Sequence, residues 1–436
     1  MIRTKKDNVN KYLIGTALTL SMLLGGGTDV GLWSDALLQI LILVAVTPVL
    51  LGRDGAVVDR TALGLVALIM IAPLAQLVPF PAGLIEALRP GQFRQPEGST
   101  AAWLSISTGL GSTLLGFAYV GVLGLLFLAI LRMPGLQVHA LLPFVLLGVA
   151  CNAAFVFVQY SASDRPAIEG VLPFTIYAGL FANRNHLASL LYVGLPFLVY
   201  FATFRGRAVW SFLAIAVTVI VLLAAGSRAG AIIGLAAVVC ATIVVRSQSK
   251  ISLAATLTTM VIVGIYAMGT ATLIDARDLD PEFGRLEFLR TTIAGIRDNW
   301  LLGVGYGTFP RAYQAYEDAT MIFASFVNHA HNDYVELIFE GGVLAGALLL
   351  AYLILLVRQA AMIRFNQFQK AALLSITFLL IHSVVDYPLR TMALSVTFVW
   401  LNAVIFHTDL RRPKMAKKHR ISVSHNGRTM ALPIEG

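Results

Sequence analysis

The chain alternates long apolar runs with short polar connections. Twelve apolar segments can be delimited, at residues 12–27, 36–51, 62–80, 113–131, 140–159, 187–204, 209–225, 229–245, 253–273, 335–357, 370–386 and 391–407. A membrane-spanning helix needs about 20 mostly apolar residues, so the shorter segments must extend into their flanks. Because lipid cannot hydrogen-bond backbone groups, segments of this kind predict helices. We therefore expect an all-α, polytopic membrane helical bundle of about 12 transmembrane helices.

The composition agrees with a surface that faces lipid. Hydrophobic residues make up 58% of the 436 residues and charged residues only 13%, about half of what a soluble domain carries. A net charge of +9 could suggest nucleic-acid binding, but the basic residues are scattered between apolar runs, so we expect no nucleic-acid partner. The two cysteines, Cys151 and Cys240, lie inside apolar runs, and we expect no disulfide framework.

The basic residues indicate an orientation. An even number of spans places both termini on one side, and if that side is cytoplasmic it carries 21 of the 32 Lys and Arg residues, including all eight lysines. The basic residues before the first segment then flank an uncleaved first span. Every basic residue of the opposite face is an arginine, whose planar fork of donors grips phosphate or carboxylate. We expect the chemistry on that face, although the excess of Arg over Lys in the chain also explains part of the pattern.

Two long outer connections divide the chain, at residues 81–112 and 274–334. Only the second is long enough for a small subdomain. We predict transmembrane helices 1–9 within residues 1–273, an outer loop subdomain containing helices at 274–334, transmembrane helices 10–12 at 335–407, and a basic cytoplasmic tail at 408–436.

A helix is predicted inside the second connection. Asp280 and Pro281 are typical of a helix start, and the helix should reach about Trp300. Spacings of three and four predict its apolar face, formed by Phe283, Leu286, Leu289, Ile293 and Ile296. Arg285 lies near its start, and Arg290 lies on another face.

Polar motifs lie at the outer ends of the spans. Arg184 and His186 stand at the entrance of the sixth span, where the alternative is a cap at Asn185 and an arginine that reaches lipid headgroups. Arg228 lies in a turn of almost no length, GSRAG, and an ionisable residue at the bilayer edge is a functional candidate. Its alternative is a snorkelling arginine at a tight turn.

The segment NHAHNDY at residues 328–334 contains two histidines before the tenth span. Histidine is the side chain best suited to move a proton near neutral pH, so His331 is a candidate general base. The alternation of His329, His331 and Asp333 also allows a metal site, although Asp333 could instead cap the span.

A fourth cluster, of His382, Asp386, Tyr387 and Arg390, lies at the outer turn between the last two spans, where Asp386 and Arg390 could form a structural ion pair. Several Arg and His residues on one face of the membrane suit an anionic, lipid-linked substrate and an acceptor that needs deprotonation.

The order of these motifs resembles the O-antigen ligase superfamily, which also contains O-antigen and exopolysaccharide polymerases. The resemblance spans about residues 70 to 400 and rests on QLVPFPAGLIEALRPG at 76–91, ANRNHLAS at 182–189, GSRAG at 226–230, GRLEF at 284–288, LLGVGYGTF at 301–309 and HAHNDYVELIFEGG at 329–342.

The resemblance implies a glycosyltransferase that moves a glycan from undecaprenyl diphosphate to an acceptor hydroxyl, with inversion and without nucleotide-sugar, metal or other cofactor. The site would lie on the periplasmic face of a bacterial inner membrane, with both termini cytoplasmic. By motif, Arg228 would hold the diphosphate, Arg285 would neutralise the leaving group and His331 would be the general base. Further substrate-binding candidates are Arg184, His186, His329, Arg290, Asn332 and Arg390.

The acceptor and the class of reaction stay open at this point. A ligase adds the chain to lipid A-core, whereas a polymerase adds it to another carrier-linked repeat, and the motifs favour neither. A transporter or flippase for a lipid-linked glycan is less favoured, because segments 36–51, 113–131 and 253–270 carry no charged residue. The sequence does not predict an oligomeric state.

Overall fold

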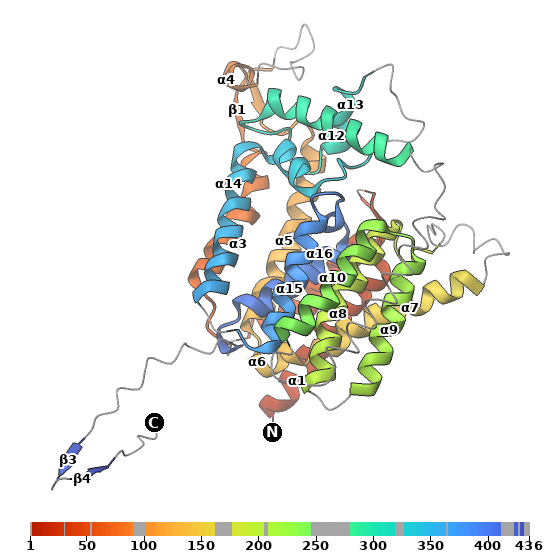
Figure 1. Ribbon diagram of the computed structural model, residues 1–436. Helices are drawn as coiled ribbons and strands as arrows, with labels where there is room; N and C mark the ends of the chain where they lie inside the picture. Colours follow the sequence, from red (N-terminus) through yellow and green to blue (C-terminus); the bar gives the residue numbers. More distant parts are fainter. Residues whose placement is uncertain are drawn as a thin grey trace.

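A computed structural model describes eleven stretches of the chain. They comprise residues 2–29, 31–52, 55–89, 101–161, 177–204, 208–245, 280–318, 327–362, 365–410, 423–425 and 428–430. Within them the protein is a helical bundle that carries a layer of shorter helices across one end (Figure 1). We call the end with this layer the outer end.

Helices cover eleven of the twelve predicted spans. They are α1 (Ile2–Leu24), α2 (Trp33–Leu50), α3 (Arg60–Ala75), α5 (Leu110–Arg132), α7 (Leu142–Ser161), α8 (Arg184–Phe204), α9 (Ala208–Ala224), α10 (Arg228–Val245), α14 (Asp333–Met362), α15 (Gln367–His382) and α16 (Met392–Phe406). The predicted span at 253–273 lies outside the described residues. Among the described residues, six helical stretches are long and apolar enough to cross a membrane, so the helical membrane bundle is confirmed and the number of twelve spans stays a prediction.

The bundle is built around α8. Its residues from Asn185 to Tyr200 are all buried, and a helix that is apolar on all sides belongs in the interior. Helices α9, α10 and α15 pack around it. Gly230 of α10 faces Ala188 of α8 so closely that a side chain there would collide with it. This close approach brings the first turns of α8 and α10 together at the outer end.

Helix α14 is broken, which corrects the prediction of one continuous span. Gly342 has φ 59° and ψ −150°, a conformation that separates an outer piece from the membrane helix. The carbonyls of Phe339 and Glu340, freed by the break, accept hydrogen bonds from the backbone of Val304 and Gly305 at 3.0 and 2.9 Å. The glycine-rich segment after α12, residues 303–307, is therefore a turn that docks against this break.

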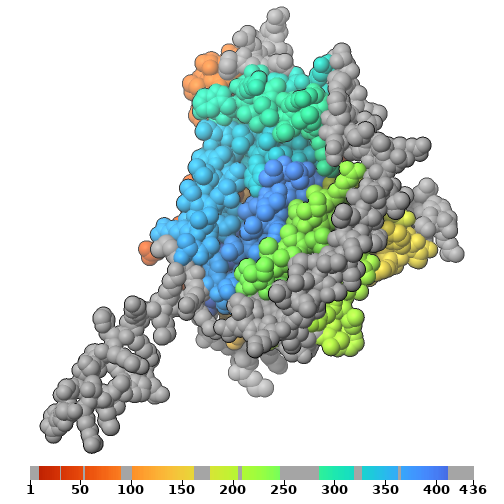
Figure 2. Space-filling model, viewed as in Figure 1, coloured from red at the N-terminus to blue at the C-terminus, as the bar shows by residue number. Residues whose placement is uncertain are grey.

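The outer layer has a small core of its own. It consists of Val304, Phe309, Ala312, Tyr313, Val327, Ala330 and Phe339. Helix α12 (Asp280–Asn299) covers it and begins and ends within one residue of the prediction, and α13 (Phe309–Gln314) follows. In the space-filling view the teal surface of α12 caps the blue C-terminal helices (Figure 2).

The predicted apolar face of α12 is partly wrong. Leu286 and Ile293 are exposed at 45% and 38%, whereas Phe288 and Ile296 pack on the outer core. A side chain at Gly295 would lie 2.5 Å from the ring of Phe339, so the helix approaches α14 through small residues. The buried face of α12 is therefore determined by how the helix packs on α14 as well as by its hydrophobic residues.

A second outer connection braces the same turn. Strands β1 (Pro79–Pro81) and β2 (Trp103–Ser105) pair antiparallel around α4 (Ala82–Leu88). Buried Arg89 donates to the carbonyls of Ile106 and Gly303, and burial lowers the pKa of Arg89 to about 10. This arginine therefore ties the connection to the turn after α12.

Three short helices and two strands complete the described elements. Helices α6 (Gly135–His139) and η3 (Thr408–Leu410) lie at the end opposite the outer layer, and η2 (Pro388–Arg390) lies at the outer end. Strands β3 (Val423–His425) and β4 (Arg428–Met430) pair with each other within the predicted tail. Helix α1 starts, and α16 finishes, at the end away from α12 (Figure 1). That both termini are cytoplasmic stays a prediction.

Candidate active site

The site is centred on the turn between α15 and α16. Helix α15 ends at His382, and Asp386 follows in the turn with its side chain fully buried. Its own turn contributes a hydrogen bond from the backbone amide of Tyr387 to Oδ1 at 2.8 Å. A carboxylate buried this deeply requires charged or polar partners.

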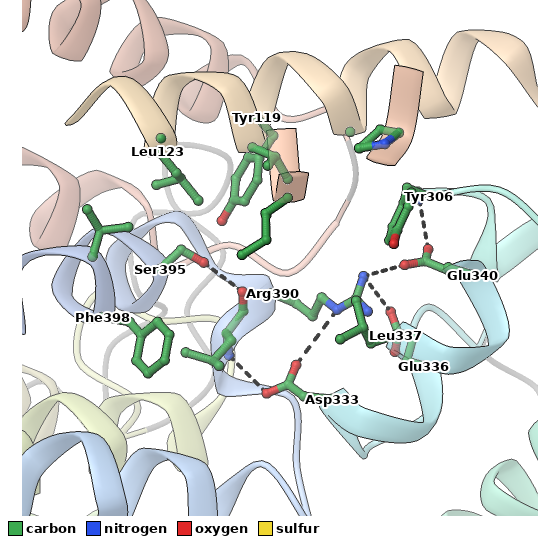
Figure 3. A pocket seen from close by; sticks show the side chains of 18 of the residues that line it. Tyr119, Leu123, Tyr306, Asp333, Glu336, Leu337, Glu340, Arg390, Ser395 and Phe398 are labelled. Atoms are coloured by element: carbon green, nitrogen blue, oxygen red, sulfur yellow. Dashed lines mark hydrogen bonds and ion pairs between the residues drawn. The ribbon is translucent and has the colours of Figure 1, made fainter. Parts of the chain in front are cut away.

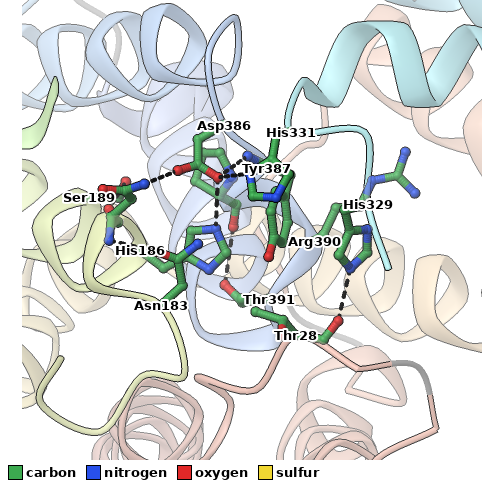
Figure 4. A network of polar contacts seen from close by, with 12 residues as sticks. Thr28, Asn183, His186, Ser189, His329, His331, Asp386, Tyr387, Arg390 and Thr391 are labelled. Atoms are coloured by element: carbon green, nitrogen blue, oxygen red, sulfur yellow. Dashed lines mark hydrogen bonds and ion pairs between the residues drawn. The ribbon is translucent and has the colours of Figure 1, made fainter. Parts of the chain in front are cut away.

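Four side chains from three other segments supply those partners, and Figure 4 labels two of them, His186 and His331. Asn185 of α8 donates its amide to Oδ2, and His186 Nε2 lies 3.5 Å from Oδ1. From the segment before α14, His331 Nδ1 lies 3.7 Å from Oδ1, and Arg285 of α12 places a guanidinium nitrogen 3.9 Å from Oδ2. Asp386 thus joins the bundle to the outer layer.

Asp386 is charged in this setting. Burial alone would raise its pKa, but the imidazoles of His186 and His331 hold the pKa of Asp386 well below its usual range. A carboxylate that stays ionised can orient a histidine and stabilise its protonated form. Asp386 therefore has the geometry and the charge of a residue that positions His331.

His331 adopts an unusual backbone conformation. Its φ is 52°, in the left-handed region that few residues other than glycine enter. The ring stacks on Phe288 at 5.6 Å and meets Tyr387 edge-on at 4.8 Å. Its side chain is 20% exposed. Because Nδ1 faces Asp386, Nε2 is the atom that can meet a hydroxyl group, and a strained residue held this way is typical of a functional site.

Two further arginines gather beside the first turns of α8 and α10. Arg184 and Arg228 are both exposed at these helix starts. A side chain at Gly226 would lie 3.7 Å from the guanidinium of Arg184, so this arginine lies over the turn that carries Arg228. Helix N-termini attract anions, and arginine side chains add charge and donors. The pair forms a suitable place for phosphate.

The alternative cap at Asn185 is wrong. Asn183 Oδ1 accepts the backbone amide of Asn185 at 2.8 Å, so Asn183 caps α8. Asn185 is free of that task and its amide binds Asp386. His186 is fully buried and contacts the same carboxylate, so its position is that of a residue that supports Asp386.

His329 has a different environment from His331. Its Nδ1 lies 2.8 Å from Glu336 and its Nε2 lies 2.8 Å from the carbonyl oxygen of Thr28. Both partners accept hydrogen bonds, so both ring nitrogens carry protons and the ring is an imidazolium. Burial would lower its pKa, but the charge of Glu336 raises the pKa of His329 above 6.5. His329 ties α14 to the α1–α2 connection.

Arg390 is held by three carboxylates of the outer piece of α14 (Figure 3). Its guanidinium lies 3.7 Å from Asp333, 3.4 Å from Glu336 and 2.7 Å from Glu340. Burial would lower the pKa of Arg390, and these carboxylates raise it above its usual value. The ion pair between Asp386 and Arg390, considered from the sequence, is wrong because each residue has other partners.

The helix cap expected at Asp333 is also wrong. Asn332 Oδ1 accepts the backbone amides of Tyr334 and Val335, both at 3.0 Å. Asp333 instead accepts from the hydroxyl of Ser383 at 2.7 Å. Asn332 is thus a cap, and its amide donates to the carbonyl of Val384 at 2.7 Å.

The geometry separates the predicted residues into groups. It brings His331, Arg285 and His186 together on Asp386, and it places Arg184 beside the turn of Arg228. Arg290 is 63% exposed and lies 3.8 Å from Glu287 of its own helix. His329, His331 and Asp333 have separate partners, so their alternation in the sequence does not make them converge as metal ligands.

Comparison with known proteins agrees with the motif order. Residues 213–350 match the family model described as O-antigen ligase. This match supports the resemblance to the O-antigen ligase superfamily. The matched residues include Arg228, Arg285 and His331. No curated protein matched the chain.

Asp386 is the residue of this site that sequence reasoning undervalued. Asp386 lies beyond the matched region, and the sequence suggested only a structural ion pair with Arg390, four residues later. One signal was available: an acidic residue in a short turn between two apolar segments needs a partner. The sequence did not say which partner it has.

Proposed function

We propose that this protein transfers a glycan from undecaprenyl diphosphate to an acceptor hydroxyl at the periplasmic face of a bacterial inner membrane. Family members are glycosyltransferase-like membrane enzymes. One observation carries the proposal: Asp386 holds a candidate base, His331, and a candidate leaving-group cation, Arg285, on its two oxygens.

The proposed step is a direct displacement. His331 Nε2 removes the proton of the acceptor hydroxyl while its oxygen forms a bond to the anomeric carbon of the donor glycan. The bond between that carbon and the diphosphate breaks, and the diphosphate leaves with the electron pair. The proton stays on His331, where Asp386 stabilises the imidazolium. One displacement inverts the configuration at the anomeric carbon.

The arginines balance the charge of the diphosphate. Arg285 has a side chain that is 39% exposed, so part of its guanidinium is available to a substrate while it contacts Asp386. Arg228 and Arg184 offer further donors at two helix starts. A diphosphate is a good leaving group once its charge is neutralised, and fixed arginine donors can supply that neutralisation.

The acceptor distinguishes two versions of the proposal. A ligase would use lipid A-core and a polymerase would use another carrier-linked repeat, and the step above is the same in both. A flippase needs charged groups along its path through the membrane, whereas the arginines named here gather at the outer end of the bundle.

The test uses His331→Ala, Arg285→Ala and Arg228→Ala in cells that make the glycan. Each variant should reduce transfer by at least about 10²-fold, the usual contribution of one positioned catalytic group. Arg297→Ala is the matched control, because Arg297 is exposed on the same helix as Arg285. Normal glycan transfer by His331→Ala at normal protein abundance would refute the proposal.

The same cells separate the alternatives. If lipid-linked repeats accumulate on the outer leaflet of the His331→Ala strain, export is intact and the flippase version is excluded. If the gene is deleted and long chains still form on the carrier, the protein is a ligase; if only single repeats remain, it is a polymerase.

A further inference from the structure

A large cavity lies on the other side of the site from the arginine pair. Its volume is ≈ 690 Å³, within the range of about 300–1,000 Å³ typical of ligand sites. Most of the lining comes from α2, α3, α5, α14 and α16, and the connections at the outer end contribute the remaining residues. Figure 3 shows part of this lining, including Tyr119, Leu337 and Phe398. None of its lining residues belongs to α8 or α10.

The cavity follows the depth of the bundle. Tyr306 and Arg390 line it at the outer end, while Phe127 and Phe406, near the opposite ends of α5 and α16, line its far end. Trp33 and Leu115 also line it and are 90% and 56% exposed, so it opens onto the surface that faces lipid. An opening of this kind admits a hydrocarbon chain sideways from the bilayer.

The lining is mainly apolar, with a few polar groups towards the outer end. Asp35 Oδ1 is buried and has no hydrogen-bond partner within the described part of the chain. Gln39 and Tyr119 line the cavity as well. A buried acceptor without a donor is costly, and a hydroxyl group of a ligand would satisfy it.

The outer roof of the cavity does not suit a diphosphate. Its two described cations are Arg390 and His329, and both are already engaged by buried carboxylates of α14. The exposed arginines proposed for the diphosphate, Arg184 and Arg228, do not line the cavity. The carrier-linked donor therefore has its phosphate site elsewhere.

The roof is nevertheless next to the candidate base. His329 lines the cavity, and its ring stacks on Tyr387 at 4.3 Å. Tyr387 also meets His331 edge-on, with ring centroids 4.8 Å apart. One aromatic ring thus contacts both a residue of the cavity lining and His331, so a lipid whose chain fills the cavity would have its headgroup near the base.

We propose that this cavity binds the hydrophobic chain of a lipid-linked acceptor, which makes it a second lipid site distinct from that of the donor. The proposal rests on the proposed function, because it assigns the two sides of His331 to the two substrates. The donor enters beside α8 and α10, and the acceptor enters between α3–α14 and α16. The acceptor is then a membrane lipid that carries a hydroxyl-bearing headgroup and no carrier diphosphate, which is the ligase version of the proposed function.

The test is photolabelling of the full-length protein in nanodiscs. The probe is a synthetic glycolipid with one isoprenoid chain bearing a diazirine, a neutral disaccharide headgroup and no phosphate. Labelling should map to cavity residues such as Leu349 and Phe398. Gly116→Phe, which fills the cavity from α5, and Leu349→Trp, which fills it from α14, should each lower labelling at least tenfold.

Gly121→Phe is the matched control, because Gly121 lies on α5 with open space around it and does not line the cavity. Its labelling should equal that of the unmodified protein, and excess undecaprenyl diphosphate should leave all labelling unchanged. The proposal is overturned if undecaprenyl diphosphate displaces the probe, since the cavity would then hold the donor. It is also overturned if the cavity is not labelled, or if neither filling variant reduces labelling.

Failure of the proposed function is recognised separately. The His331→Ala variant should keep full labelling, because binding in the cavity does not need the base. If that variant still transfers glycan, the proposed function fails while the labelling result stands.

Discussion

Replacing Asp386 by Asn tests how much the buried charge contributes to transfer. The substitution keeps the size of the side chain and an oxygen that can accept from the amide of Tyr387. It removes the negative charge that faces His331 and Arg285. The reaction converts His331 to an imidazolium, so the variant loses the counter-charge when it is needed.

The magnitude follows from the distance. Unit charges 3.7 Å apart, the separation of His331 Nδ1 and Asp386 Oδ1, attract by about 4 kcal/mol at an effective dielectric constant of about 20. His331 is 20% exposed, so solvent screens part of this, and about 2–3 kcal/mol is a fair expectation. Since 1.36 kcal/mol is tenfold in rate, kcat should fall about 10²-fold.

The assay measures the kcat and the KM of transfer by purified protein in nanodiscs, and kcat should be lower by this factor. The KM for the donor should stay equal or fall, since Arg285 loses an anion that competes with phosphate. A structural role alone would not produce this combination.

Asp409→Asn is the control, because this carboxylate lies at the opposite end and accepts from the amide of Gly135. Wild-type kcat in Asp386→Asn would show that Asp386 does not assist the base. A fall in kcat of Asp409→Asn by the same factor would show that the loss is a general effect of the amide.

Two further predictions concern stability. The pKa of His329 is raised above 6.5 in the folded protein, so its stabilising effect is fully present below that pH and is lost as the pH rises through the raised value. The melting temperature in detergent should therefore fall above pH 6.5, and His329→Gln should weaken this pH dependence. An equal pH dependence of the melting temperature in both proteins would contradict a protonated His329. Gly342→Ala should lower the free energy of unfolding by about 1–3 kcal/mol, because Gly342 has φ 59° and an added Cβ would lie 2.5 Å from the carbonyl oxygen of Leu301. Gly346→Ala on the same helix has open space and should be neutral or stabilising, so equal losses in the two variants, measured by thermal unfolding, would refute the claim of a strained break.

The apolar runs alone determined most of the helices. A run of about 20 apolar residues predicts a membrane helix wherever it occurs, because its hydrophobic length is a local property. The start of α12 at Asp280 was readable for a similar reason, since capping and the preference of proline for the first turn depend on adjacent residues. Short motifs likewise pointed to His331, Arg285 and Arg228.

Contacts between distant segments were decided by the tertiary structure. Asp386 binds Asn185, about two hundred positions away in the chain, while Arg390, four residues along, turns to three carboxylates of α14. The break at Gly342 forms because the turn after α12 binds the freed carbonyls. Charges pair according to which segments pack together, and packing depends on complementary shapes that no single stretch of sequence contains. The sequence therefore determined the helices and the chemical groups at their outer ends, and only the packed bundle decided which of these groups meet at His331.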